Sequence, residues 1–109
     1  MQTIENKYRE RDYEVKIRFP EFTCLCPMTS QPDFAEIVIN YVPNEMLVEL
    51  KALKFYLNSF RDKGIFHEEV VNKILNDFVE KIHPKRVEVT GNFNVRGGLH
   101  ATVRASYPV

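Results

Sequence analysis

Two helical repeats of apolar residues follow one another in the middle of this chain. From residue 46 the apolar positions recur at steps of four, three, four and three: Met46, Leu50, Leu53, Leu57 and Phe60. A second stripe consists of Val71, Ile74, Leu75, Phe78 and Ile82. Such spacing places the apolar residues on one face of a helix. It predicts two helices, the first capped by Asn44 and ended by Gly64, the second running from near Phe66 to Pro84.

Alternation with a period of two, before and after the helical pair, predicts four half-buried strands. The alternating segments are 13–19, 34–42, 87–95 and 99–107. Pro20 is expected to stop the first strand, and Gly91 is expected to mark a bulge in the third. Arg96-Gly97-Gly98 predicts a tight turn between the last two strands.

The element order is therefore β-β-α-α-β-β, which predicts an α+β fold with an antiparallel sheet and two helices on one face. A chain of 109 residues fits a single domain, 1–109, and the polar residues 1–11 are expected to form a loosely tied, flexible leader. Four strands leave open sheet edges, which proteins often protect by pairing them. We expect a homo-oligomer in which the edges join between subunits into a barrel.

Charge and cysteine usage narrow the possible functions. Fifteen basic residues balance fifteen acidic ones, so no overall field favours nucleic acid or an anionic membrane. Cys24 and Cys26 are the only cysteines, and they lie too close together for an unstrained bridge. No signal peptide and no apolar run of membrane-spanning length is visible. A soluble cytoplasmic protein with reduced thiols is expected.

The irregular stretch from Phe22 to Phe34 holds both cysteines and two of the six prolines. Cys26 is the candidate nucleophile, because it precedes Pro27 in a loop that also contains the acid Asp33. A buried structural cysteine and a turn carboxylate are the alternative interpretations. Cys24 is interpreted as a packing residue.

Two further groups of residues stand out. Glu49, Lys51, Lys54 and Tyr56 fit a phosphate-binding ridge on the first helix, or a solvated helix face. His67-Glu68 fits recognition of a purine-like base, or capping of a helix start. Zinc is not expected, because the histidines show no compact spacing with the thiols. No metal site is predicted.

These motifs together resemble the NADPH-dependent 7-cyano-7-deazaguanine reductases of queuosine biosynthesis, in their short single-module form. The resemblance runs from about Phe22 to Gly98. It rests on the segments Leu25-Cys26-Pro27, Gln31-Pro32-Asp33-Phe34, Glu49-Leu50-Lys51-Ala52-Leu53-Lys54-Phe55-Tyr56, Phe66-His67-Glu68 and Arg96-Gly97-Gly98, in this order. It implies the tunnelling fold shared with GTP cyclohydrolase I, stacked pentameric rings, and active sites at subunit interfaces.

The resemblance also implies a role for each matching residue. Cys26 attacks the nitrile carbon of 7-cyano-7-deazaguanine to form a thioimide, and Asp33 is the general acid. Two NADPH molecules then reduce the adduct and the released imine to 7-aminomethyl-7-deazaguanine. Substrate contacts are expected from Val48, Glu49, Leu50, His67 and Glu68. Cofactor contacts are expected from Lys51, Lys54, Arg96 and Gly97.

Two other functions stay open at this point. An archaeosine-type amidinotransferase would act on the same nitrile in tRNA and use no NADPH, so the Glu49–Tyr56 segment favours the reductase. A non-catalytic purine-binding module of the same fold would hold Cys26 as a buried residue and form no adduct.

Overall fold

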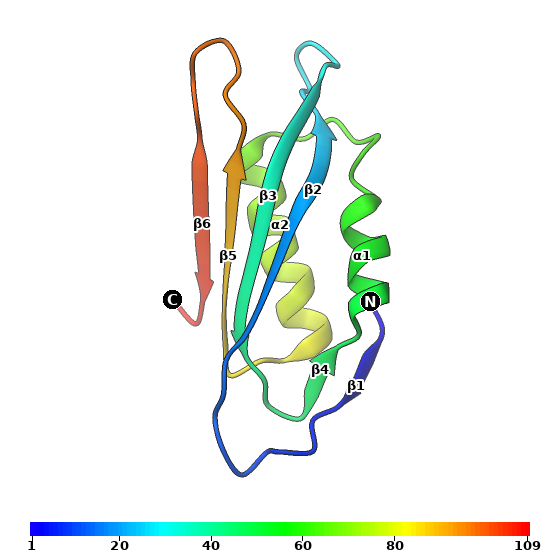
Figure 1. Ribbon diagram of the computed structural model, residues 1–109, viewed down its shortest axis with the longest axis vertical. Coiled ribbons are helices and arrows are strands. Elements are labelled where there is room, and N and C mark those ends of the chain that lie inside the picture. Colours follow the sequence, from blue (N-terminus) through cyan, green and yellow to red (C-terminus); the bar gives the residue numbers. More distant parts are fainter.

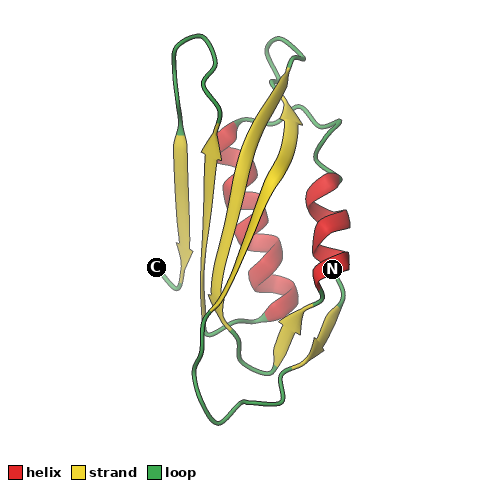
Figure 2. Ribbon diagram, in the orientation of Figure 1, coloured by secondary structure: helices red, strands yellow, loops and turns green.

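The computed structural model describes residues 1–109. Its main layer is a four-stranded antiparallel sheet in the order β2-β3-β5-β6, and two helices cover one face of it (Figures 1 and 2). The strands are β2 (Val15–Leu25), β3 (Pro32–Val42), β5 (Arg86–Phe93) and β6 (Thr102–Tyr107), and the helices are α1 (Leu50–Asn58) and α2 (His67–Ile82). The predicted α+β class is confirmed. Neither helix is long and apolar enough to cross a lipid bilayer.

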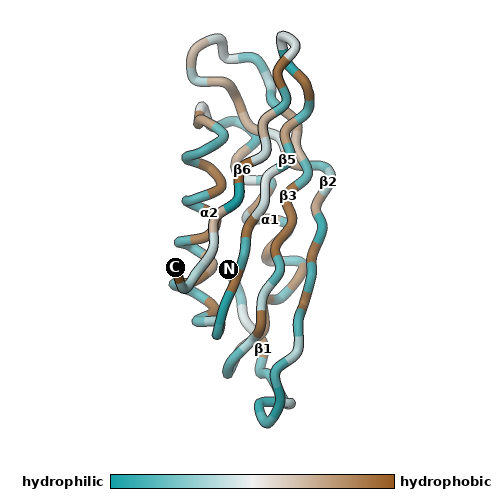
Figure 3. The backbone as a smooth tube through the Cα atoms, turned by 90° about the vertical axis from the view of Figure 1, so that its left-hand side faces the viewer, coloured by the Kyte–Doolittle hydropathy of each residue, from teal (hydrophilic) through white to brown (hydrophobic).

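A second, two-stranded sheet corrects the prediction of a loose leader over residues 1–11. Strand β1 (Thr3–Glu5) pairs antiparallel with β4 (Met46–Val48). Asn6 is only 1% exposed, its amide donates to the Asn44 carbonyl at 2.8 Å, and it accepts from the Tyr13 hydroxyl at 2.6 Å. The hydrophilic loop that follows is visible near the β1 label in Figure 3. The beginning of the chain is therefore tied to the segment that leads into α1.

The start of the first helix also differs from the prediction. Residues 46–48 are extended, and Glu49 rather than Asn44 is the N-cap of α1. The Glu49 carboxylate accepts from the backbone N–H groups of Lys51 at 2.8 Å and Ala52 at 3.0 Å. Because these donors have no partner inside the helix, the capping carboxylate fixes where α1 begins.

The predictions of a strand end at Pro20 and of a bulge at Gly91 are both wrong. β2 continues through Pro20 to Leu25, with a register shift against β3 between Phe19 and Phe22. A proline is tolerated there because β2 is an edge strand. The pairing of β5 runs without a shift through Gly91, so no bulge occurs there. A Cβ at Gly91 would lie 2.8 Å from side-chain atoms of both Phe93 and Val71, so the close packing of α2 on the sheet requires this glycine.

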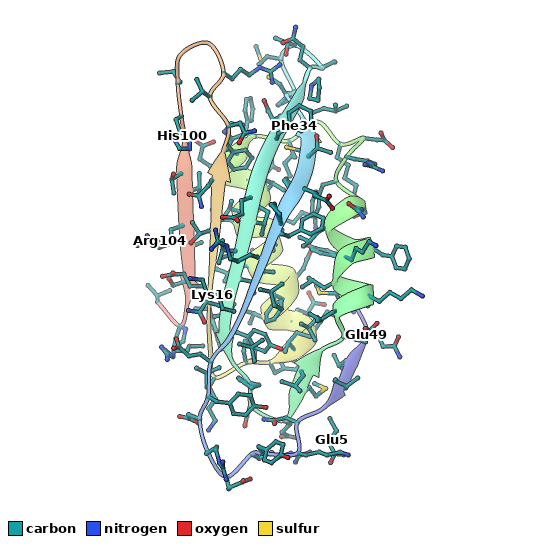
Figure 4. The ribbon with its side chains drawn as sticks, in the orientation of Figure 1. Glu5, Lys16, Phe34, Glu49, His100 and Arg104 are labelled. Atoms are coloured by element: carbon teal, nitrogen blue, oxygen red, sulfur yellow. The ribbon has the colours of Figure 1, made fainter.

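The core lies between the sheet and the helices, and it confirms the second helical stripe. All five predicted α2 residues are buried. Tyr41 of β3 packs edge-on against Phe78, with the ring centroids 4.8 Å apart. The opposite face of the sheet is polar; Arg18, for example, forms a two-pronged ion pair with Glu36 there. Lys16 and Arg104, on strands β2 and β6, are labelled in Figure 4.

Candidate active site

The loop between β2 and β3 is held at both ends by backbone hydrogen bonds. Leu25 pairs with the segment before α2: its N–H donates to the Lys63 carbonyl at 2.9 Å, and its own carbonyl accepts from Ile65 at 3.0 Å. Within the loop, Cys26 donates to the Gln31 carbonyl and accepts from Ser30, both at 2.8 Å. The backbone around Cys26 is therefore fixed relative to the start of α2.

Cys26 is the more reactive of the two thiols. Its side chain is free and half-buried. Hydrogen bonding from the Thr29 side chain, helped by the backbone N–H groups of Met28 and Thr29, lowers the pKa of Cys26 below the ordinary value, against the opposing effects of partial burial and of the Asp33 charge. A lowered pKa enlarges the thiolate fraction near neutral pH, and the thiolate is the nucleophilic form.

Cys24 is a core residue. It has no exposed surface and packs within the hydrophobic cluster. Burial raises the pKa of its thiol to about 11, and the nearby charge of Asp33 acts in the same direction. It therefore stays a neutral thiol at physiological pH, in agreement with its interpretation as a packing residue.

Asp33 is buried between two partners. Its side chain is 8% exposed, His67 Nε2 lies 3.2 Å from its Oδ2, and Arg96 Nη1 donates to its Oδ1. The backbone of Asp33 is fixed by the Thr23 hydroxyl, which donates to its carbonyl at 2.8 Å. The Asp33 carboxyl group therefore has a defined position at the second residue of β3, directly after the loop that contains Cys26.

His67 is the first residue of α2, and its ring is held flat against Phe93 of β5. The ring centroids are 3.7 Å apart and the planes are inclined by 7°. Because the stack leaves the ring little freedom to tilt, Nε2 stays directed at Asp33. The alternating pattern predicts only a strand position for Phe93, and no sequence signal indicates that it supports a site residue.

Arg96 reaches the site from the turn between β5 and β6. As predicted, the turn is tight: Arg96 and Leu99 exchange backbone hydrogen bonds at 2.9 and 3.0 Å, and both glycines have positive φ, 57° at Gly97 and 83° at Gly98. The Arg96 guanidinium also donates to the Pro32 carbonyl at 3.1 Å and to the Gln31 side chain.

These residues surround one cavity of about 260 Å³, near the end of the sheet that carries the β2–β3 loop. The cavity brings together five of the residues predicted for the site, namely Cys26, Asp33, His67, Glu68 and Arg96. Its remaining wall includes Phe66 and Leu99, which sequence reasoning did not assign to the site and which are 50% and 78% exposed. Phe66 is part of the matching segment Phe66-His67-Glu68, which is the sequence signal that points to it.

The other predicted site residues lie away from this cavity, around the N-terminus of α1. Val48 is buried and donates its N–H to the Tyr41 hydroxyl at 3.1 Å, Glu49 caps the helix, and Leu50 is 60% exposed. Lys51 and Lys54 are exposed on α1, and Gly97 does not line the cavity either. Figure 4 shows the separation between Glu49 and Phe34, the neighbour of Asp33.

Tyr56 contacts both helices and is not part of the exposed face of α1 that carries Lys51 and Lys54. Its hydroxyl donates to Asp77 of α2 at 2.5 Å, and its ring packs edge-on against Phe60. Burial, together with the Asp77 contact, raises the pKa of Tyr56. Its position fits the packing interpretation.

The model of the QueF-like protein family matches residues 32–108. A protein named NADPH-dependent 7-cyano-7-deazaguanine reductase from Thermomicrobium roseum is 54% identical over 98% of this chain and 84% of its own length. One of the same name from Nitrosococcus oceani is 52% identical over 98% of this chain and 83% of its own.

The solved structures give a fold comparison. The crystal structure of the archaeosine synthase QueF-Like in the apo form superimposes with a TM-score of 0.76 and 24% identity, covering 87% of this chain and 91% of the other. This likeness shows the fold, which is the tunnelling fold expected from the sequence. Since the family model covers most of the chain and relatives share more than half of its residues, the chain belongs to the QueF-like protein family.

Proposed function

We propose that this protein reduces the nitrile of 7-cyano-7-deazaguanine to the amine of 7-aminomethyl-7-deazaguanine with NADPH. The observation that carries the proposal is the single cavity lined by the free thiol of Cys26 and the buried carboxyl of Asp33. Relatives that are more than half identical over nearly the whole chain carry the name of this reductase. The two free thiols suit a reducing cytoplasm.

Cys26 acts as the nucleophile and Asp33 as the general acid. The Cys26 thiolate forms a bond to the nitrile carbon, one C–N π bond opens, and its electron pair takes the proton that Asp33 releases. The result is a neutral thioimide on Cys26 and an ionised Asp33. The lowered pKa of Cys26 supports its role, because more thiolate is present at neutral pH.

His67 and Glu68 bind the edge of the base. Glu68 is exposed at the mouth of the cavity, one residue from His67, and its carboxylate can only accept hydrogen bonds when ionised. The ring N–H and exocyclic amine of a guanine-like base both donate, so an acceptor at this place suits them. The Val48–Leu50 segment completes the pocket from a neighbouring subunit.

The α1 lysines and the β5–β6 turn bind the cofactor phosphates. NADPH supplies the hydride, and two equivalents are needed to take a nitrile to an amine. Lys51 and Lys54 fit this role because both are exposed, stand three residues apart on one helix face, and form no ion pair with a carboxylate in the chain. Arg96-Gly97 provides the second contact.

The active protein is an oligomer with sites at its interfaces. Strands β2 and β6 are the two edges of the main sheet, and each can pair with the other edge of a neighbouring copy. Repetition of this contact around an axis closes a barrel, for which we propose stacked pentamers. A shared site explains why the α1 residues lie away from the Cys26 cavity in the single chain.

The proposal is tested by incubating the protein with 7-cyano-7-deazaguanine and NADPH while nicotinamide absorbance and intact mass are followed. The expected result is two NADPH oxidised per nitrile, and a mass increase of one substrate on the protein when NADPH is omitted. An adduct without any NADPH oxidation supports the amidinotransferase class instead. Absence of both signals supports reversible purine binding.

Lys51→Ala and Lys54→Ala are each expected to raise the KM for NADPH by roughly five- to tenfold, because each removes one solvent-exposed contact worth about 1–1.4 kcal/mol. The adduct formed without NADPH should be unaffected. Lys81→Ala, an exposed lysine in the last turn of α2, is the matched control and should leave the KM unchanged. Loss of the adduct in both α1 variants contradicts the assignment.

Sharing of the site between subunits predicts complementation. Cys26→Ala and the double variant Lys51→Ala/Lys54→Ala are each expected to be poorly active alone. When the two chains are co-expressed, some interfaces combine an intact Cys26 with intact lysines, and NADPH oxidation should rise above that of either parent. Mixed oligomers with no gain in activity would show that the thiol and the lysines serve the same site from one chain.

A further inference from the structure

The ion pair between Arg96 and Asp33 conflicts with the proposed role of Asp33 as a general acid. The guanidinium donates to Oδ1, and His67 occupies Oδ2, so both carboxyl oxygens have partners. A guanidinium carries a positive charge and can donate hydrogen bonds but not accept them, so its contact with Asp33 favours the carboxylate form over the carboxylic acid. A general acid must instead carry a proton that points at the substrate.

The Arg96 side chain can move away from Asp33 at low energetic cost. Its side chain is 36% exposed, and its remaining contacts, with Gln31 and the Pro32 carbonyl, lie at the surface. The turn that carries it has little support, since Val95 and Leu99 are 67% and 78% exposed and nothing lies within 4 Å of a Cβ at either glycine. Segments with few packed contacts move at low energetic cost.

Arg96 is also the only lysine or arginine that lines the cavity. Arginine forms two-pronged contacts with phosphate, and a dianionic phosphate is a stronger competitor for it than a single carboxylate. Two anions can therefore compete for the Arg96 guanidinium: the Asp33 carboxylate within the chain and a phosphate of the incoming cofactor.

On the basis of the proposed function, we infer that Arg96 is a switch that keeps Asp33 from acting as an acid until the cofactor arrives. With the cofactor absent, Arg96 pairs with Asp33. When a cofactor phosphate binds Arg96, the guanidinium leaves Oδ1, and Asp33 takes up a proton from solvent. Asp33 then gives this proton to the nitrile nitrogen as the Cys26 sulfur bonds to carbon. Thioimide formation is thereby faster when the reductant is in place.

The test measures the rate of adduct formation by quenched intact-mass analysis, with and without NADP⁺, which carries the phosphates and has no hydride to give. In the unaltered protein, NADP⁺ is expected to accelerate the adduct by about tenfold or more, a part of the effect a general acid supplies. Arg96→Gln should form the adduct at the accelerated rate without NADP⁺, and NADP⁺ should add nothing. Its KM for NADPH should nevertheless rise.

Two variants complete the design. Arg11→Gln, which removes a surface arginine with a 68% exposed side chain, should behave like the unaltered protein. In the double variant Asp33→Asn/Arg96→Gln the acceleration should vanish, because no acid is left to release. A slower adduct in Arg96→Gln overturns the switch and makes Arg96 a residue that only positions Asp33. Acceleration by NADP⁺ that persists in Arg96→Gln also overturns it. If the unaltered protein forms no adduct, the proposed function itself fails.

Discussion

Cys26→Ala is expected to abolish both the covalent adduct and nitrile-dependent NADPH oxidation. The variant removes the only thiol that lines the cavity, while the Asp33 carboxyl and the residues proposed to bind the base remain. Loss of a covalent nucleophile typically lowers turnover by roughly a thousandfold or more. Intact mass after incubation with 7-cyano-7-deazaguanine should show unmodified protein. The nicotinamide absorbance should decrease no faster than the background rate.

Cys24→Ala is the matched control, because it removes the other thiol from the same strand end. Cys24 is fully buried and its pKa of about 11 keeps it protonated, so this variant should still form the adduct. A small loss of stability is expected from the shortened core side chain. An adduct that survives in Cys26→Ala and disappears in Cys24→Ala would reverse the assignment of the two thiols.

The parts of the fold that the sequence predicts are those with a repeating pattern. The α2 stripe spans about three turns without interruption, and all of its residues are buried as expected. The start of α1 was mispredicted because Met46 fits the helical spacing by chance, while residues 46–48 pair with β1 more than forty positions earlier in the chain. A three-residue strand has no period to detect, and its partner is visible only in three dimensions.

Backbone exceptions account for the remaining errors. Pro20 normally ends a strand, but an edge strand can bend around it when no neighbour needs its missing N–H. Gly91 was interpreted as a bulge, although the demand for it comes from Val71 on a helix twenty residues away. In both cases the explanation lies in the three-dimensional surroundings of the residue: an absent neighbouring strand for Pro20 and a packed helix for Gly91.

Site residues that lie close together in the sequence could be predicted to lie close together in space, whereas those far apart in the sequence could not. Cys26 and Asp33 belong to one hairpin, so a motif of eight residues already places them near each other. His67 and Arg96 come from a helix start and a distant turn, and their convergence on the Asp33 carboxyl could not be read from spacing. Arg96 was assigned to the cofactor alone; its pairing with the acid is a property of the folded chain.

Asp33→Asn is the second change with a large expected effect. Asparagine keeps the size and the acceptor oxygen of the side chain, but it cannot deliver a proton to the nitrile nitrogen. Adduct formation in the presence of NADP⁺ and NADPH oxidation should both fall by roughly 10²- to 10⁴-fold, the usual contribution of a general acid. The rate of adduct formation, followed by intact mass at saturating substrate, separates this effect from weaker binding.

Glu36→Gln provides the matched carboxylate-to-amide control on the same strand. Glu36 lies on the polar face of the sheet and pairs with Arg18 at the surface, so its loss should leave the adduct rate unchanged. If Asp33→Asn slows NADPH oxidation but forms the adduct at the normal rate, the proton for the first step comes from another group. With His67 held 3.2 Å from Asp33 by its stack on Phe93, the imidazole would be the nearest candidate, and the roles of the two residues would have to be exchanged.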